Sequence, residues 1–83
     1  MTRTRDQVYE ASERLADQLE VKEPAARTEI RLAARLLSLS ERTGESSTEI
    51  LDTALELAQS LTSNYKIDVN NHILAQQLLS AAS

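Results

Sequence analysis

The chain contains no cysteine and has very little glycine, proline or aromatic residue. Its 83 residues include one Gly, one Pro, two Tyr, and neither Phe nor Trp. The lack of cysteine excludes a disulfide framework and thiolate ligands for zinc, and a single glycine does not make a phosphate-cradling loop. Few helix breakers and few aromatic or β-branched residues favour helices over strands. The sequence therefore predicts an all-α fold whose core is built from its 13 Leu and 11 Ala.

Long apolar runs are also missing. No segment approaches the roughly 18 apolar residues of a membrane span, and the first residues, MTRTRDQ, lack the apolar core of a signal peptide. We therefore expect a cytoplasmic protein with no membrane partner. His72 is the only histidine, and no nucleophile elbow or glycine loop accompanies it or Asp68. We accordingly expect no enzymatic activity, no catalytic residue, no metal, no cofactor and no small-molecule substrate.

The length fits a single helical domain over residues 1–83, with short flexible ends at 1–3 and 81–83. A domain of this size buries only about 60 to 65% of the surface that its unfolded chain exposes. Because such a core is small, we expect a second copy of the chain, or another protein, to supply additional buried area. A homodimer is the expected assembly.

Apolar periodicity and capping residues predict a bundle of about four helices. Thr4 with Gln7, and Ser46 with Glu49, fit the capping box at a helix N-terminus. Pro24 suits a first helical turn, and Gly44 suits the left-handed residue that ends a helix. The expected helices span approximately 4–20, 24–43, 47–62 and 70–80.

Charge is unevenly distributed along the chain. The net charge is -4, but residues 1–42 hold eight basic and eight acidic side chains, whereas residues 43–83 hold one Lys and five acids. At 100° per residue, four arginines of the second expected helix fall within an arc of about 80°. Two interpretations stay open for this arginine stripe: an edge that pairs with glutamates of neighbouring helices, or a rail that binds phosphate. The arginine stripe comprises Arg27, Arg31, Arg35 and Arg42.

The segment LAARLLSLSERTGESSTEILDTALEL, residues 32–57, resembles the two helices of ribbon-helix-helix transcriptional regulators. The resemblance implies a dimer that binds DNA. The DNA-reading strand of that family would fall at residues 24–28, PAART, which instead has the pattern of a helix start. The residues that match the family's turn and second helix are Gly44, Ser46, Thr48, Glu49, Ile50, Leu51, Ala54 and Leu55.

Two shorter segments are similar to other regulators. TRDQVYEASERLADQ, followed by EPAARTEIR, is similar to the DNA-binding segment of plasmid KfrA-type regulators. NYKIDVNNHILAQQLL is similar to the tail of flagellar anti-sigma factors, with the spacing stretched by one or two residues. The first resemblance implies a nucleic-acid partner and the second implies a protein partner.

The sequence thus supports two functional hypotheses. The leading one is a non-enzymatic regulator that binds DNA as a dimer through the arginine stripe, helped by Arg3, Arg5 and Ser46. The alternative is a helical adaptor, regulatory subunit or anti-sigma-like inhibitor that binds a larger protein and no nucleic acid. In either case the expected dimer or partner interface comprises Leu32, Leu36, Leu39, Ile50, Leu57 and Leu61.

Overall fold

A computed structural model describes residues 3–83, and these form four α-helices and no strand. The helices are α1 (Arg5–Gln18), α2 (Pro24–Arg42), α3 (Ser47–Asn64) and α4 (Asn71–Ala82). The prediction of a small all-α bundle is confirmed, and each helix boundary lies within two residues of its expected position. Met1 and Thr2, which belong to the flexible end expected at 1–3, lie outside the described residues.

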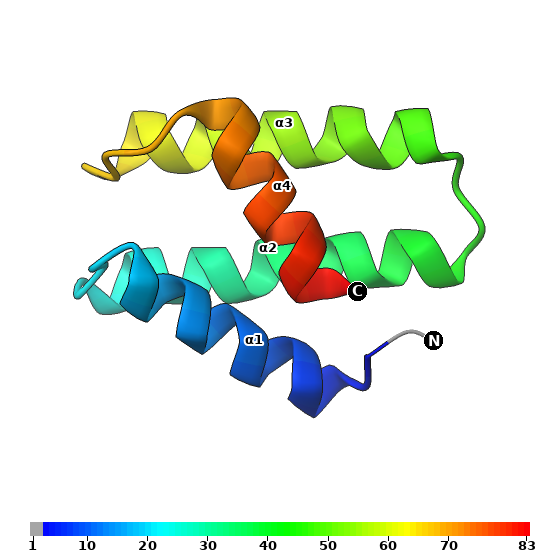
Figure 1. Cartoon of the computed structure of the whole chain (residues 1–83), viewed down its shortest axis with the longest axis horizontal. Coiled ribbons are helices and arrows are strands. Elements are labelled where there is room, and N and C mark those ends of the chain that lie inside the picture. Colours follow the sequence, from blue (N-terminus) through cyan, green and yellow to red (C-terminus); the bar gives the residue numbers. More distant parts are fainter. Residues whose placement is uncertain (1–2) are drawn as a thin grey trace.

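Helices α2 and α4 each pack against all three other helices, whereas α1 and α3 do not contact each other. Helices α2 and α3 form an antiparallel hairpin, and α4 crosses one face of that hairpin (Figure 1). Helix α1 lies against α2 and α4 on the same side. One face of the α2–α3 hairpin is therefore covered by α1 and α4, and the opposite face has no helix packed on it.

Side chains at the N-termini of α1, α3 and α4 satisfy backbone donors, although Ser46 and Glu49 form only one of the two hydrogen bonds of the predicted capping box. The Thr4 and Gln7 side chains form both hydrogen bonds of a capping box at α1. The Ser46 hydroxyl accepts a hydrogen bond from the Glu49 amide at α3, at 3.2 Å. Asn70 caps α4 by accepting from the His72 amide at 2.8 Å.

Helices α1 and α2 end in the same backbone motif. After α1, the Glu20 amide donates to the Asp17 carbonyl and the Val21 amide to the Ala16 carbonyl. After α2, Gly44 and the residue that follows it repeat this pattern, which is the Schellman motif. Glu20 and Gly44 occupy its left-handed position, with φ of 57° and 81°. The sequence predicts a left-handed residue at Gly44 but not at Glu20, so α1 is shorter than expected.

The core is made of aliphatic and alanine side chains from all four helices. Its largest fully buried members are Val8, Ile30, Leu37, Leu74 and Leu78. Alanines let the helices approach closely, as at Ala34, which packs with residues of α1 and α4. The core lies between the α2–α3 hairpin and the two helices that cover it, α1 and α4.

The last turn of α4 belongs to this core. The helix continues to Ala82, two residues beyond the expected end at 80, and Ala81 and Ala82 are both buried. The Ser83 hydroxyl accordingly lies close enough to α2 to donate to the Glu41 carboxylate at 3.2 Å. The C-terminal turn thereby contributes to packing against α1 and α2.

We expect Leu74→Ala to lower the free energy of unfolding by about 2–5 kcal/mol, because it leaves a cavity in a fully buried position. The neighbouring Ile73 is 53% exposed, so Ile73→Ala is the matched control and should change stability by about 0.5 kcal/mol or less. Urea denaturation followed by circular dichroism measures both. Equal losses for the two variants would contradict the packing of α4 described above.

Substitutions at the two left-handed positions should change the free energy of unfolding in opposite directions. Gly44→Ala should destabilise by about 1 kcal/mol, because a side chain disfavours this conformation, and no atom lies within 4 Å of the added Cβ to cause a clash. Glu20→Gly should stabilise by a similar amount, since it removes a side chain from the same conformation. Thermal unfolding of both variants beside the unsubstituted chain tests this, and a change of the same sign in both would count against it.

Candidate interaction surfaces

The first arginine of the stripe, Arg27, binds α1. Its Nη2 lies 2.6 Å from Glu13 Oε2 and 2.9 Å from Asp17 Oδ1. Its Nη1 donates to the Val21 carbonyl at 2.7 Å. The hydrogen bond to Glu13, then the one to Asp17, raise the pKa of the Arg27 guanidinium above its ordinary value, although burial acts in the opposite direction. Arg27 thus joins α1, the α1–α2 connection and α2.

Two further arginines of the stripe also contact α1 or the segment just before it. The Arg31 guanidinium lies over the Tyr9 ring, 5.3 Å from its centroid, a cation–π contact. The Arg42 Nη2 donates to the Arg3 carbonyl at 2.7 Å. These contacts, with those of Arg27, support the interpretation that the stripe pairs with a neighbouring helix. Arg35 is half-buried at the same edge of α2.

The other residues predicted to bind nucleic acid lie outside α2. Arg3 is half-buried just before α1, and Arg5 is exposed at the first position of α1. Ser46 lies between α2 and α3, where its hydroxyl serves as the N-cap of α3. Residues 24–28, where the DNA-reading strand of the ribbon-helix-helix resemblance would fall, form the first turn of α2.

A stripe of leucines is exposed along α2. Leu32, Leu36 and Leu39 are 51%, 45% and 40% exposed. Their spacing of four and three residues places them on one side of the helix, opposite the buried Ile30 and Ala34. We call these three residues the leucine stripe. It lies on the face of the hairpin that α1 and α4 leave uncovered.

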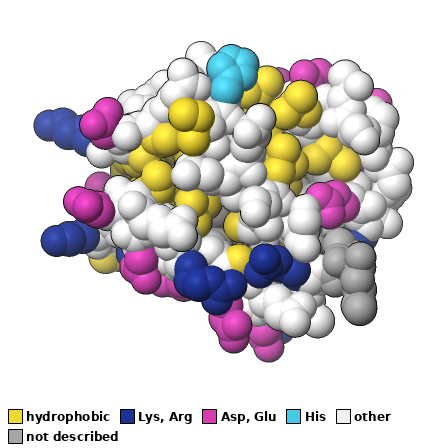
Figure 2. Space-filling model, in the orientation of Figure 1, with side chains coloured by type: hydrophobic (Ala, Val, Ile, Leu, Met, Phe, Trp, Pro, Cys, Tyr) yellow, Lys and Arg dark blue, Asp and Glu magenta, His cyan; other side chains and the backbone are white. Residues whose placement is uncertain are grey.

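The remaining residues of the expected interface belong mainly to the fold. Leu61 is 3% exposed and lies in the core, while Ile50 and Leu57 are half-buried and pack against it. These three positions therefore contribute to intramolecular packing. On the face that α4 crosses, hydrophobic side chains also reach the surface in separate groups (Figure 2), and Leu51 and Ile73 are the exposed large side chains of α3 and α4.

Charged residues are placed at regular spacing beside the leucine stripe. Arg35 and Arg42, seven residues apart, lie on the flank of α2 that faces away from α3. Glu49 and Glu56, also seven residues apart, are exposed on α3 and lie opposite the buried Ala58. Because α4 packs on the other face of the hairpin, the two glutamates and the leucine stripe share the uncovered face.

Residues 3–83 lack a metal cluster and a membrane-spanning helix. No group of three or more His, Asp or Glu side chains there is arranged to hold a metal ion. No helix in this part of the chain has both the length and the apolar character needed to cross a membrane. Comparison of the chain with protein-family models, with curated proteins and with solved structures found no match.

Replacing Arg27 by Gln should lower the midpoint of thermal unfolding, because α1 loses its ion pairs and its bond to the Val21 carbonyl. The loss should be smaller in 1 M NaCl, since Arg27 is partly exposed and salt screens its pairs in the unsubstituted chain. Arg5→Gln is the control and should shift the midpoint less. A larger effect of Arg5→Gln would show that general charge, and not these contacts, sets the stability.

Proposed function

We propose that the chain is a non-enzymatic interaction module that pairs with a second copy of itself through the leucine stripe. The supporting observation is the 40–51% exposure of Leu32, Leu36 and Leu39 on α2. Their four-then-three spacing is the pattern of residues at a helix–helix seam. Pairing α2 with α2 of a second copy removes this apolar surface from water.

The charges beside the leucine stripe favour a parallel pairing of the two α2 helices. A two-fold axis perpendicular to α2 would set the Arg35 and Arg42 flank against the same flank of the second copy, which brings like charges together. An axis parallel to α2 sets that flank against the second copy's α3. There it meets the face that carries Glu49 and Glu56.

The levels of these charges along the helices agree. Helices α2 and α3 are antiparallel and joined by a short connection, and Arg42 is the last residue of α2 while Glu49 is the third residue of α3, so both lie close to it. Arg35 and Glu56 each lie seven residues further away. In the parallel pairing, Arg42 of one copy is therefore level with Glu49 of the other, and Arg35 with Glu56. Two symmetric sets of opposite charges frame the leucines.

The leucine stripe alone is too small for a stable interface, so the flanking charged surface must also be buried. A stable specific interface buries roughly 600–1,000 Å² on each partner. Three partly exposed leucines do not supply that area, whereas one face of the 19-residue α2 together with the outer face of α3 extends over about 28 Å of helix length. The leucines form the apolar centre of this surface and the charges form its rim, as in other protein interfaces.

Nucleic-acid binding is the second candidate function. It is supported by Arg5, Arg14 and Arg35, which form no ion pair in the described part of the chain. Against it, Arg27 and Arg31 already contact α1, and the net charge of -4 repels a polyanion. This candidate predicts a salt-dependent mobility shift of DNA or RNA that Arg35→Glu abolishes.

Leu36→Glu should convert the dimer into a monomer, because it places a charge at the centre of the apolar seam. Sedimentation equilibrium of the 9.2-kDa chain measures the change, with an expected rise in the dimer dissociation constant of at least 100-fold. Ile73→Glu, at a similarly exposed position on α4, is the matched control and should leave the dimer intact.

Charge reversal tests the orientation of the pair. The double variant Arg35→Glu and Arg42→Glu should weaken the dimer, and adding Glu49→Arg and Glu56→Arg should restore it. Failure of this restoration would contradict the parallel arrangement. A monomer for the unsubstituted chain at all concentrations would overturn the proposal, and capture of a different protein or of DNA by that monomer would favour one of the other two hypotheses.

A further inference from the structure

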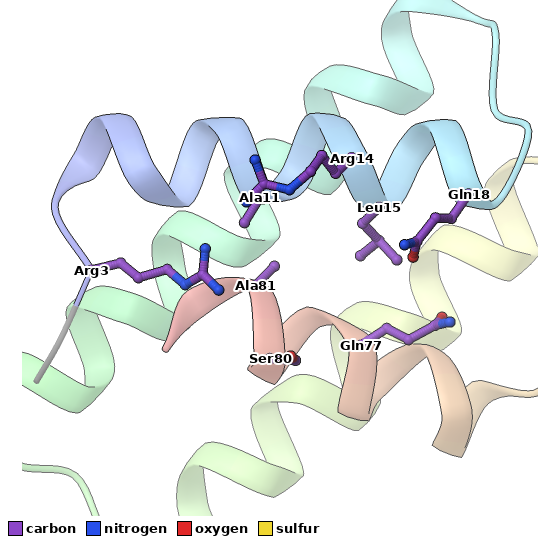
Figure 3. Close-up of a pocket in the computed structure, with 8 residues that line it drawn as sticks. All are labelled: Arg3, Ala11, Arg14, Leu15, Gln18, Gln77, Ser80 and Ala81. Atoms are coloured by element: carbon purple, nitrogen blue, oxygen red, sulfur yellow. The ribbon is translucent and has the colours of Figure 1, made fainter.

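A cavity of about 180 Å³ lies between α1 and α4. It lies among helix faces other than the one that carries the leucine stripe. Its wall combines apolar side chains with cationic and amide groups (Figure 3). The residues that line it are Arg3, Ala11, Arg14, Leu15, Gln18, Gln77, Ser80 and Ala81.

Two arginines approach this cavity from different segments. Arg3 extends from the residues before α1 toward the end of α4, and Arg14 projects from the middle of α1 (Figure 3). Neither forms an ion pair within residues 3–83. The backbone of Arg3 is fixed to α2, since its carbonyl accepts a hydrogen bond from Arg42. Two guanidinium groups that share a cavity without a carboxylate partner favour an anion there.

A buried acceptor lies at the other end of the cavity. The Gln77 Oε1 atom is buried and has no hydrogen-bond donor. In Figure 3 the Gln77 and Gln18 side chains face each other across the gap between α4 and α1. Leaving a buried acceptor unsatisfied is unfavourable, so turning the Gln77 amide toward a ligand N–H or O–H group in the cavity would gain free energy.

From these groups we infer that the cavity is a binding site for a small organic anion that also carries a hydroxyl or amino group. The anion, a carboxylate or a phosphate, lies between the Arg3 and Arg14 guanidiniums. The hydroxyl or amino group donates to Gln77 Oε1. The carbon atoms between them contact Leu15 and the alanines of the wall.

The cavity has room for a small organic molecule. Its volume of about 180 Å³ is many times the roughly 10–15 Å³ that a single water requires. Hydroxy acids, amino acids and short sugar phosphates have this size and combine the two required groups.

The test is an NMR titration of the full 15N-labelled chain with four probes at matched ionic strength. Lactate and glycerol 3-phosphate carry an anion and hydroxyl, propionate carries the carboxylate alone, and sodium chloride is the ionic control. With the first two probes we expect amide chemical-shift changes that saturate at millimolar concentrations. These changes should occur at Ala11, Leu15, Ser80 and Ala81. Comparing those two distinguishes carboxylate from phosphate. Shifts that do not saturate, or that chloride reproduces, would overturn the inference.

Matched variants connect binding to named groups. Arg14→Gln should weaken lactate binding at least tenfold, whereas Arg5→Gln, also on α1 but outside the cavity wall, should change it less than twofold. Equal weakening by both would show general electrostatic attraction and overturn the site. Gln77→Leu should reduce the affinity for lactate to that for propionate, and an unchanged preference would remove Gln77 from the site. The Leu36→Glu variant should bind lactate as the unsubstituted chain does, because the leucine stripe lies on another face.

Discussion

The burial of α2 is the interaction on which the rest of this structure depends. Nearly two thirds of the circumference of α2 is apolar, and three helices pack against it. Ile30 and Leu37 are completely buried, and burying one such side chain contributes about 1.5–3 kcal/mol. Four short helices without aromatic residues in the core have few alternative sources of stability. Helices α1 and α3 pack on different sides of α2, and α4 packs against all three.

Helix α1 is attached to α2 by both apolar and polar contacts. Val8 and Leu15 contribute buried apolar surface, while Arg27 and Arg31 fix the outer edge of the contact through carboxylates and an aromatic ring. Exposed ion pairs contribute little individually, so the apolar contacts supply most of the stability and the arginines determine how α1 is aligned. The regular spacing of the arginine stripe is therefore explained by its contacts with α1, although in the sequence the same spacing is also typical of a binding surface.

The sequence predicts the fold better than it predicts the surfaces. Periodicity and caps locate the four helices, because Thr4, Pro24 and Gly44 act through local backbone chemistry. The contact between Arg27 and Glu13 joins different helices, so it depends on how α1 is placed beside α2. The same limit applies to Leu61, which shares the apolar character of Leu36 but lies on the core side of α3. The cavity between α1 and α4 combines residues from opposite ends of the chain, and no local pattern predicts it.

The two proposed surfaces are compatible in one assembly. The leucine stripe and its flanking charges lie on the face of the hairpin opposite α4, whereas the cavity lies between α4 and α1. Pairing two copies through α2 leaves both cavities on the outside of the dimer. Arg42 lies near both the dimer surface and the cavity. It donates a hydrogen bond to the Arg3 carbonyl beside the cavity and belongs to the flank that faces the second copy's α3. The hydrogen bond from Arg42 to the Arg3 carbonyl lies within one copy, so breaking the dimer at Leu36 leaves it in place. Arg3 therefore keeps its position beside the cavity in the monomer, and binding of the ligand and pairing of the two copies are independent equilibria.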